Sequence, residues 1–241
     1  MQERKKLVIL PGWSNDGDRL WQYQIQHLAE QYDIETIVVS NQSNASDMAD
    51  EVLRRAPETF ILLGHSLGGF IAQHVAIKAP ERVERLILVG TFPGNVPDEQ
   101  RTFFKQGMLE PLREGAIPED YWQTLNPSCV DPERAEDGVL LAQMAAGQNL
   151  SCESLINQTN VLISAQDISE KLPAADMPTL IIYGAQDQLF SKTMQELMLD
   201  KLPNATLEVV EDCGHMPSIE RPMTVTKLLV SWLASDKNTF R

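Results

Sequence analysis

One serine lies in a setting that can make its hydroxyl a nucleophile. The stretch from Leu62 to Gly69 has the sequence LLGHSLGG, in which an apolar run enters a Gly-x-Ser-x-Gly turn. Glycines in such a turn allow the backbone to bend so sharply that the central serine projects above the end of a strand. This pattern is typical of a nucleophile elbow, and it makes Ser66 the candidate nucleophile.

The flanks of this turn carry more weight than the five-residue motif, because glycine and serine are common residues. The run Thr59–Leu63 is typical of a buried parallel strand, and Phe70–Ala76 is typical of a helix with small apolar residues. Strand, turn and helix therefore follow one another in the order that an elbow requires.

A serine hydroxyl needs an imidazole to accept its proton, and the imidazole needs a carboxylate to hold it in the right tautomer. Among the four histidines, His215 alone follows the end of a predicted strand. His27 lies in a helical pattern, His74 lies in the helix after the elbow, and His65 precedes the serine in the turn. We expect structural or surface roles for these three, so His215 is the candidate base.

The acid that orients this imidazole is expected at another strand end. Asp187 follows the apolar run Leu180–Tyr183 and precedes a helical pattern, and active groups of open parallel sheets gather at such strand ends. An aspartate in this place can also be a simple helix N-cap. Asp212 is the rival acid, because it is closer to His215 in the sequence. We favour Asp187, since a neighbouring strand end can approach the imidazole across the sheet.

The oxyanion that forms on an attacked carbonyl requires hydrogen-bond donors. The backbone amide of Leu67, directly after the serine, is one candidate, and that of Trp13, in the loop after the first apolar run, is the other. The indole of Trp13 would then border the substrate pocket. The residues that we assign to this pocket are Trp13, Phe92, Phe104 and Met108.

Apolar runs that alternate with helical patterns predict an α/β class with a six-stranded, mostly parallel sheet flanked by helices. The runs are Leu7–Leu10, Ile34–Val39, Phe60–Leu63, Leu86–Val89, Leu180–Tyr183 and Ala205–Val210. Between Thr91 and about Asp176 the pattern is helical only. We therefore predict a core domain over 1–93 and 177–241 and a helical cap inserted over 94–176.

With these residues in place, the chain resembles the α/β-hydrolase superfamily, and within it the small carboxylesterases that include the pimeloyl-carrier-protein methyl esterases. Four pieces carry the resemblance: Pro11–Trp13, Gly64–Gly69, Gly184–Asp187, and Gly214-His215 followed by Glu220–Pro222. One departure is that Pro11-Gly12 stands where the family usually has His-Gly. The resemblance implies an α/β-hydrolase fold whose helical cap shapes the substrate pocket and limits the access of water.

Composition excludes several other classes of function. A net charge of −14 opposes binding to nucleic acid or to anionic membranes. The apolar run after the N-terminal charges is too short for a secretory signal or a membrane span, so we expect a cytoplasmic protein. Cys129, Cys152 and Cys213 lack metal or redox spacing and are expected to be reduced, non-catalytic thiols. We expect neither a metal nor a cofactor.

These residues predict a serine hydrolase that cleaves a small-molecule carboxylic ester through an acyl-enzyme. A narrower alternative is a methyl esterase whose substrate is bound to an acyl carrier protein, an acidic partner that requires a basic surface. The segment Asp98–Asp176 has five basic and fourteen acidic residues, although Arg101, Lys105 and Arg113 could share one helical face. Two further alternatives are a lyase that uses the same triad and a ligand sensor without fast turnover.

Overall fold

The computed structural model describes residues 4–94 and 96–235, so the predicted core ends 1–3 and 236–241, and residue 95 of the predicted cap, lie outside the described residues. Its centre is a six-stranded sheet in the order β2-β1-β3-β4-β5-β6, and all neighbouring strands are parallel. The strands are β1 (Lys5–Leu10), β2 (Tyr32–Thr36), β3 (Phe60–His65), β4 (Val83–Val89), β5 (Thr179–Gly184) and β6 (Ala205–Val210). This α/β sheet confirms the predicted fold class.

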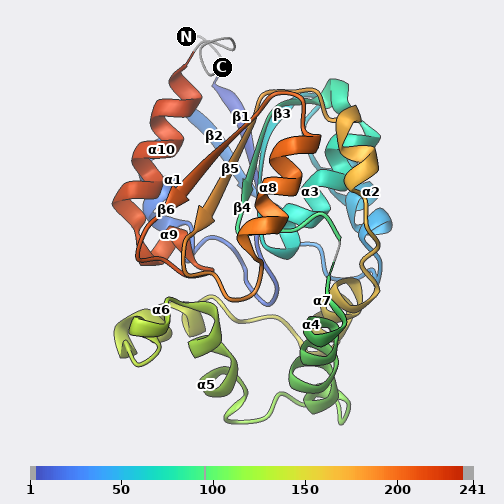
Figure 1. Cartoon of the computed structure of the whole chain (residues 1–241), viewed down its shortest axis with the longest axis vertical. Coiled ribbons are helices and arrows are strands. Elements are labelled where there is room, and N and C mark those ends of the chain that lie inside the picture. The colour runs from blue at the N-terminus through green and yellow to red at the C-terminus, as the bar shows by residue number, and fades with distance from the viewer. Residues whose placement is uncertain (1–3, 95, 236–241) are drawn as a thin grey trace.

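Helices cover both faces of the sheet (Figure 1). On one face lie α1 (Gln22–Leu28) and α10 (Pro222–Ala234), and on the other lie α2 (Ala45–Arg55), α3 (Leu67–Lys78) and α8 (Lys192–Lys201). Successive strand residues point to opposite faces, so Leu7 packs with the first group and Val8 with the second. The strands therefore read as continuous apolar runs because both of their faces are buried.

The second strand begins and ends earlier than the sequence predicted. The apolar run suggested Ile34–Val39, whereas β2 spans Tyr32–Thr36. One further ladder bond joins the Ile37 N–H to the Ile9 carbonyl, after which β1 ends at Leu10 and offers no more partners. Val39 is still buried, and its carbonyl accepts a hydrogen bond from the Gln158 side chain. Core packing rather than sheet pairing thus explains the apolar end of this run.

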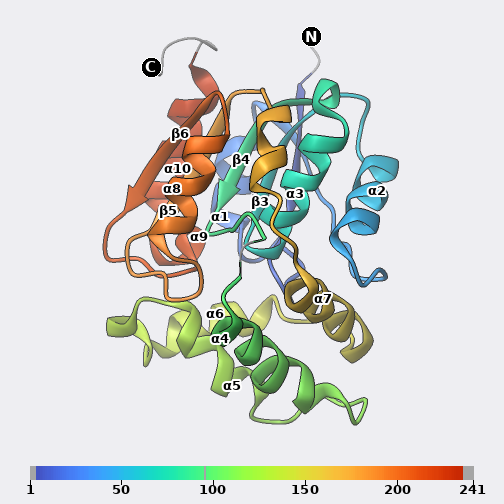
Figure 2. The same cartoon turned by 45° about the vertical axis from the view of Figure 1, so that its right-hand side comes forward.

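The long segment between β4 and β5 forms helices and turns throughout its described part. It contains α4 (Asp98–Phe103), a π-helical stretch (Phe104–Leu109), α5 (Tyr121–Leu125), α6 (Gly138–Ala146) and α7 (Cys152–Ser164). Figures 1 and 2 show these helices as a layer across the carboxyl ends of the strands. We call this layer the cap; its limits at 94 and 176 stay a prediction. A short helix, α9 (Pro217–Glu220), precedes α10. None of the helices in 4–94 and 96–235 is long and apolar enough to span a membrane.

The turn between β3 and α3 brings backbone atoms unusually close together. Ser66 has φ 54° and ψ −120°, a backbone conformation that residues other than glycine rarely adopt. A Cβ atom at Gly68 would lie 2.2 Å from the Leu10 carbonyl oxygen, and one at Gly64 would lie 2.5 Å from the Gly68 oxygen. The elbow is therefore possible only because these two residues lack side chains.

We expect Gly68→Ala to lower the free energy of unfolding by about 1–3 kcal/mol, the usual cost of overpacking. The added methyl would meet backbone atoms, which cannot move aside as a flexible side chain can. Urea denaturation of both proteins measures the change. The matched control is Gly138→Ala at the start of α6, where no atom lies within 4 Å of an added Cβ. This control should keep or gain stability, because alanine favours a helix; equal losses in the two variants would contradict the explanation.

Candidate active site

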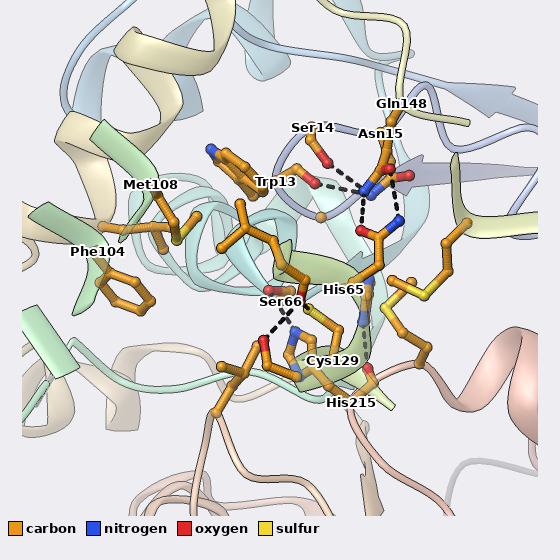
Figure 3. Close-up of a pocket in the computed structure, with 18 of the residues that line it drawn as sticks. Trp13, Ser14, Asn15, His65, Ser66, Phe104, Met108, Cys129, Gln148 and His215 are labelled. Atoms are coloured by element: carbon orange, nitrogen blue, oxygen red, sulfur yellow. Dashed lines mark hydrogen bonds between the residues drawn. The ribbon is translucent and has the colours of Figure 1, made fainter. Parts of the chain in front are cut away.

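The structure brings the three predicted catalytic side chains together at the carboxyl edge of the sheet. Ser66 follows β3, Asp187 follows β5 and His215 follows β6. The Ser66 hydroxyl lies 2.9 Å from His215 Nε2, and His215 Nδ1 lies 2.8 Å from Asp187 Oδ2 (Figure 3 shows the serine and histidine). The serine can donate its proton to the imidazole while the imidazole donates to the carboxylate. This is the geometry that activates a serine hydroxyl.

Of the two candidate acids, only Asp187 contacts the imidazole. Its other oxygen accepts hydrogen bonds from the backbone N–H groups of Leu189 and Phe190, at 2.8 and 3.1 Å, which fix its orientation. The Asp212 side chain is 80% exposed and lies 3.7 Å from Arg221 instead. The geometry therefore favours Asp187 as the partner of His215.

The remaining histidines differ in their relation to this site. His65 is buried in the cavity wall, and its Nε2–H donates to the backbone carbonyl of His215. Burial and the neighbouring His215 lower the pKa of His65 to about 3, so its ring is uncharged at neutral pH. His27 and His74 are not among the residues that line the cavity. His65 thus holds the position of the candidate base rather than replacing it.

The loop before Trp13 lies close to the serine, since a Cβ atom at Gly12 would be 3.2 Å from Ser66 Cβ, and Leu67 follows the serine directly in the chain. Within the described chain, the backbone N–H groups of Trp13 and Leu67 donate to no protein acceptor. The loop that holds Trp13 is tied to the cap: the Ser14 N–H donates to the Gln158 side chain at 2.9 Å, and the Trp13 indole donates to Thr159 Oγ1 at 2.8 Å. Because Gln158 and Thr159 are almost fully buried on α7, they hold the loop firmly.

Three of the four predicted pocket residues line the cavity above Ser66, namely Trp13, Phe104 and Met108 (Figure 3). The prediction for Phe92 was wrong: this ring is fully buried and stacks between Phe70 and Phe190, with ring centroids 4.8 and 4.3 Å away. Phe92 lies three residues after the end of β4, but its side chain packs into the core. Phe190, from the same loop as Asp187, lines the cavity in its place.

Glu220 is a site residue whose role sequence reasoning missed. Its carboxylate is 3% exposed and accepts backbone N–H bonds from both neighbours of His215, Gly214 at 3.1 Å and Met216 at 3.0 Å. It also accepts one from Asp131 in the cap, at 2.8 Å. The available signal in the sequence was a glutamate five residues after the candidate base, in the segment just before the last helix. Glu220 therefore fixes the loop that carries His215 and joins it to the cap.

The cysteines offer no competing nucleophile. Cys129 lines the cavity, but burial raises the pKa of its thiol to about 12, so the thiol stays protonated. Burial also raises the pKa of the Cys213 thiol. All three cysteines are free thiols. In the described part of the chain, no group of three or more His, Cys, Asp or Glu side chains is arranged to hold a metal ion.

Comparison with known proteins identifies the family to which this chain belongs. A model of the alpha/beta hydrolase family matches residues 7–227, and the chain belongs to this family. The chain is 27% identical over 239 residues to the pimeloyl-(acyl-carrier protein) methyl ester esterase of Pectobacterium atrosepticum, a match that covers 94% of this chain and 93% of that protein. The protein of the same name from Vibrio campbellii is 28% identical over 225 residues, which are 88% of this chain and 87% of the relative.

Solved structures show the same fold. A thermophilic esterase from Thermogutta terrifontis superimposes with a TM-score of 0.81 at 21% identity, covering 95% of this chain and 89% of that one. An enol-lactonase from Burkholderia xenovorans gives a TM-score of 0.79 at 16% identity, with 97% and 93% covered. These likenesses concern the fold, and the chemistry must be argued from the site itself.

We expect Glu220→Gln to slow the reaction of Ser66 with a fluorophosphonate probe by about 10- to 100-fold, the penalty for a small misplacement of a catalytic group. An amide keeps one acceptor oxygen but turns an NH₂ group toward backbone donors that the carboxylate now satisfies. Labelling kinetics followed by mass spectrometry measure the effect. Glu211→Gln, an exposed carboxylate on the same loop, is the control and should label at the wild-type rate. A wild-type rate in Glu220→Gln would show that the carboxylate does not position His215.

Proposed function

We propose that the protein is a serine hydrolase that cleaves carboxylic esters of small molecules. The observation that carries this proposal is the line of hydrogen bonds from Ser66 through His215 to Asp187. The reaction also needs donors for the oxyanion, and the unpartnered backbone N–H groups of Trp13 and Leu67 can supply them. The names of the relatives, which are esterases, agree with this choice of reaction.

The reaction proceeds in two halves. Ser66 Oγ attacks the ester carbonyl while His215 Nε2 takes its proton, and the carbonyl oxygen becomes an oxyanion held by the two amides. The intermediate collapses, the bond to the alcohol oxygen breaks, and His215 gives its proton to the departing alcohol. Water then attacks the acyl-serine with His215 again as base, and the acid leaves while Ser66 regains its proton. Asp187 orients the imidazole and stabilises its charged form in both halves.

We expect Ser66→Ala to remove hydrolysis of p-nitrophenyl esters, assayed from acetate to dodecanoate. Loss of a triad nucleophile costs on the order of 10⁶ in turnover. Asp187→Asn should lose most of its turnover, whereas Asp212→Asn, the exposed rival, should keep the wild-type rate. Spectrophotometric release of p-nitrophenolate measures all three variants.

The same assay separates the other chemistries that this fold can support. An acyl group trapped on Ser66, seen as a mass increase of the intact protein, would contradict a lyase that uses His215 without acyl transfer. Many turnovers per molecule would contradict a ligand sensor. Ester hydrolysis that persists in Ser66→Ala would overturn the proposal.

A carrier-bound methyl ester is the second candidate substrate, and the names of the relatives from Pectobacterium and Vibrio favour it. The basic face predicted for it is incomplete. The Arg101 guanidinium turns inward, donating to the backbone carbonyls of Val96, Ile163 and Ala165. Lys105 and Arg113 are exposed and remain available for an acidic partner.

If a carrier protein docks on the cap, the double variant Lys105→Glu/Arg113→Glu should lower kcat/KM on the carrier-bound methyl ester by about tenfold or more, because like charges suppress association. The free methyl ester of the same acyl group serves as the internal control and should be unaffected. Steady-state assays of both substrates at low and high salt measure the difference. An equal kcat/KM for the variant and the wild type on the carrier-bound ester would remove this candidate.

A further inference from the structure

The cavity above Ser66 is lined by apolar side chains and by a smaller set of uncharged polar ones. From the apolar set, we call the side chains of the cap and of the loop after β5 the apolar lobe; they are Phe104, Met108, Leu162 and Leu189. We call a group of polar side chains the amide lobe; they are Ser14, Asn15, Asn126 and Gln148. Figure 3 shows Phe104 and Met108 on the opposite side of Ser66 from Asn15 and Gln148.

No lysine, arginine, aspartate or glutamate is among the described residues that line this cavity. This is notable in a chain with 54 acidic and basic residues, 34 of them acidic. Moving an ionised group into such a cavity costs several kcal/mol unless a partner of opposite charge is present. The cavity therefore favours an uncharged substrate.

The amide lobe is a polar cluster rather than scattered side chains. Asn126 and Gln148 exchange two hydrogen bonds, at 2.8 and 3.0 Å, and Asn126 is 4% exposed. A carboxamide has two N–H donors and an oxygen with two lone pairs, so each of these amides keeps a donor and an acceptor site beyond the pair. Asn15 is 5% exposed, and its Oδ1 has no hydrogen-bond partner in the described chain.

Packing of the cap does not by itself require this cluster. The Asn126–Gln148 pair joins the end of α5 to the end of α6, which two apolar side chains could also do without leaving buried polar atoms unsatisfied. A buried acceptor such as Asn15 Oδ1 costs about 1–3 kcal/mol when it lacks a partner. The donor and acceptor sites that a ligand could satisfy are those that the Asn126–Gln148 pair leaves free.

We propose, on the basis of the ester hydrolysis inferred above, that the amide lobe is a specificity subsite for an uncharged hydrogen-bonding group of the substrate. A carboxamide or a hydroxyl fits, because each offers both a donor and an acceptor. The apolar lobe takes the hydrocarbon part on the other side of the ester carbonyl. Esters that would place a free carboxylate in the amide lobe are rejected, since no lysine or arginine is among the described residues that line the cavity.

Two matched series of esters test this subsite, because the lobe can receive the acyl end or the alcohol end. One series has methyl esters of acids that end in methyl, carboxamide or carboxylate; the other has acetates of alcohols with the same three ends. In the series whose variable end enters the amide lobe, the ester that ends in a carboxamide should have a kcat/KM about 100-fold higher than the ester that ends in a carboxylate. Titration of the released acid measures the rates.

Variants of the amide lobe show whether it causes this preference. Gln148→Arg puts a cation into the lobe. It should raise the kcat/KM of the carboxylate ester, relative to that of the carboxamide ester, by about tenfold or more. Gln143→Arg adds the same charge on the exposed face of α6, outside the cavity, and should leave the ratio unchanged. Asn126→Leu should reduce the preference for carboxamide over methyl by about 3- to 10-fold, the effect of one hydrogen bond.

A binding measurement separates failure of this subsite from failure of the proposed reaction. The same neutral and charged compounds are used to protect Ser66 from a fluorophosphonate probe, which requires no turnover. Protection by the carboxamides and not by the carboxylates, reversed in Gln148→Arg, supports the subsite even if no ester is hydrolysed. Two results would overturn the subsite. One is equal protection and equal kcat/KM for the carboxamide and the carboxylate compounds in both series. The other is a ratio of their kcat/KM values that does not change in Gln148→Arg.

Discussion

The contact between the elbow and the end of β1 is the constraint on which the rest of the site depends. Gly68 lies so close to the carbonyls of Leu10 and Pro11 that a Cβ atom would come within 2.4 Å of both oxygens. This approach places the first turn of α3 beside the loop that carries Trp13. Ser66 and the proposed oxyanion amides of Trp13 and Leu67 are consequently set relative to one another by close contact between backbone segments.

The cap contributes to the catalytic geometry as well as covering the cavity. Its buried Gln158 and Thr159 hold the loop that carries Trp13, and the Asp131 N–H shares the Glu220 carboxylate with the neighbours of His215. A displacement of the cap would therefore disturb both the loop that carries Trp13 and the loop that carries His215. In this protein, the part that shapes the substrate pocket also helps to position the groups that react, so specificity and rate are physically linked.

Electrostatics in the cavity contrast with those of the chain as a whole. The chain has a net charge of −14, yet no lysine, arginine, aspartate or glutamate is among the described residues that line the cavity. The buried ring of His65 is neutral and the thiol of Cys129 keeps its proton, each because burial disfavours the charged form. Neither group therefore competes with Ser66 and His215 for the proton transfer that we propose for them. An acidic surface and a neutral pocket together favour small uncharged substrates.

The sequence was enough to predict the sheet, the elbow and the chain order of the candidate nucleophile, acid and base, because each has a local signature in apolar runs and glycine spacing. It did not determine that Phe92 packs into the core while Phe190 lines the cavity, that Arg101 turns inward, or that Glu220 holds the histidine loop. Those outcomes depend on which side chains from distant segments fill the same space. The amide lobe is the clearest case, since Asn15 and Gln148 lie far apart in the chain and meet only when the cap folds onto the strand ends. Local patterns specify the catalytic groups, whereas the shape and polarity of the pocket arise from tertiary packing.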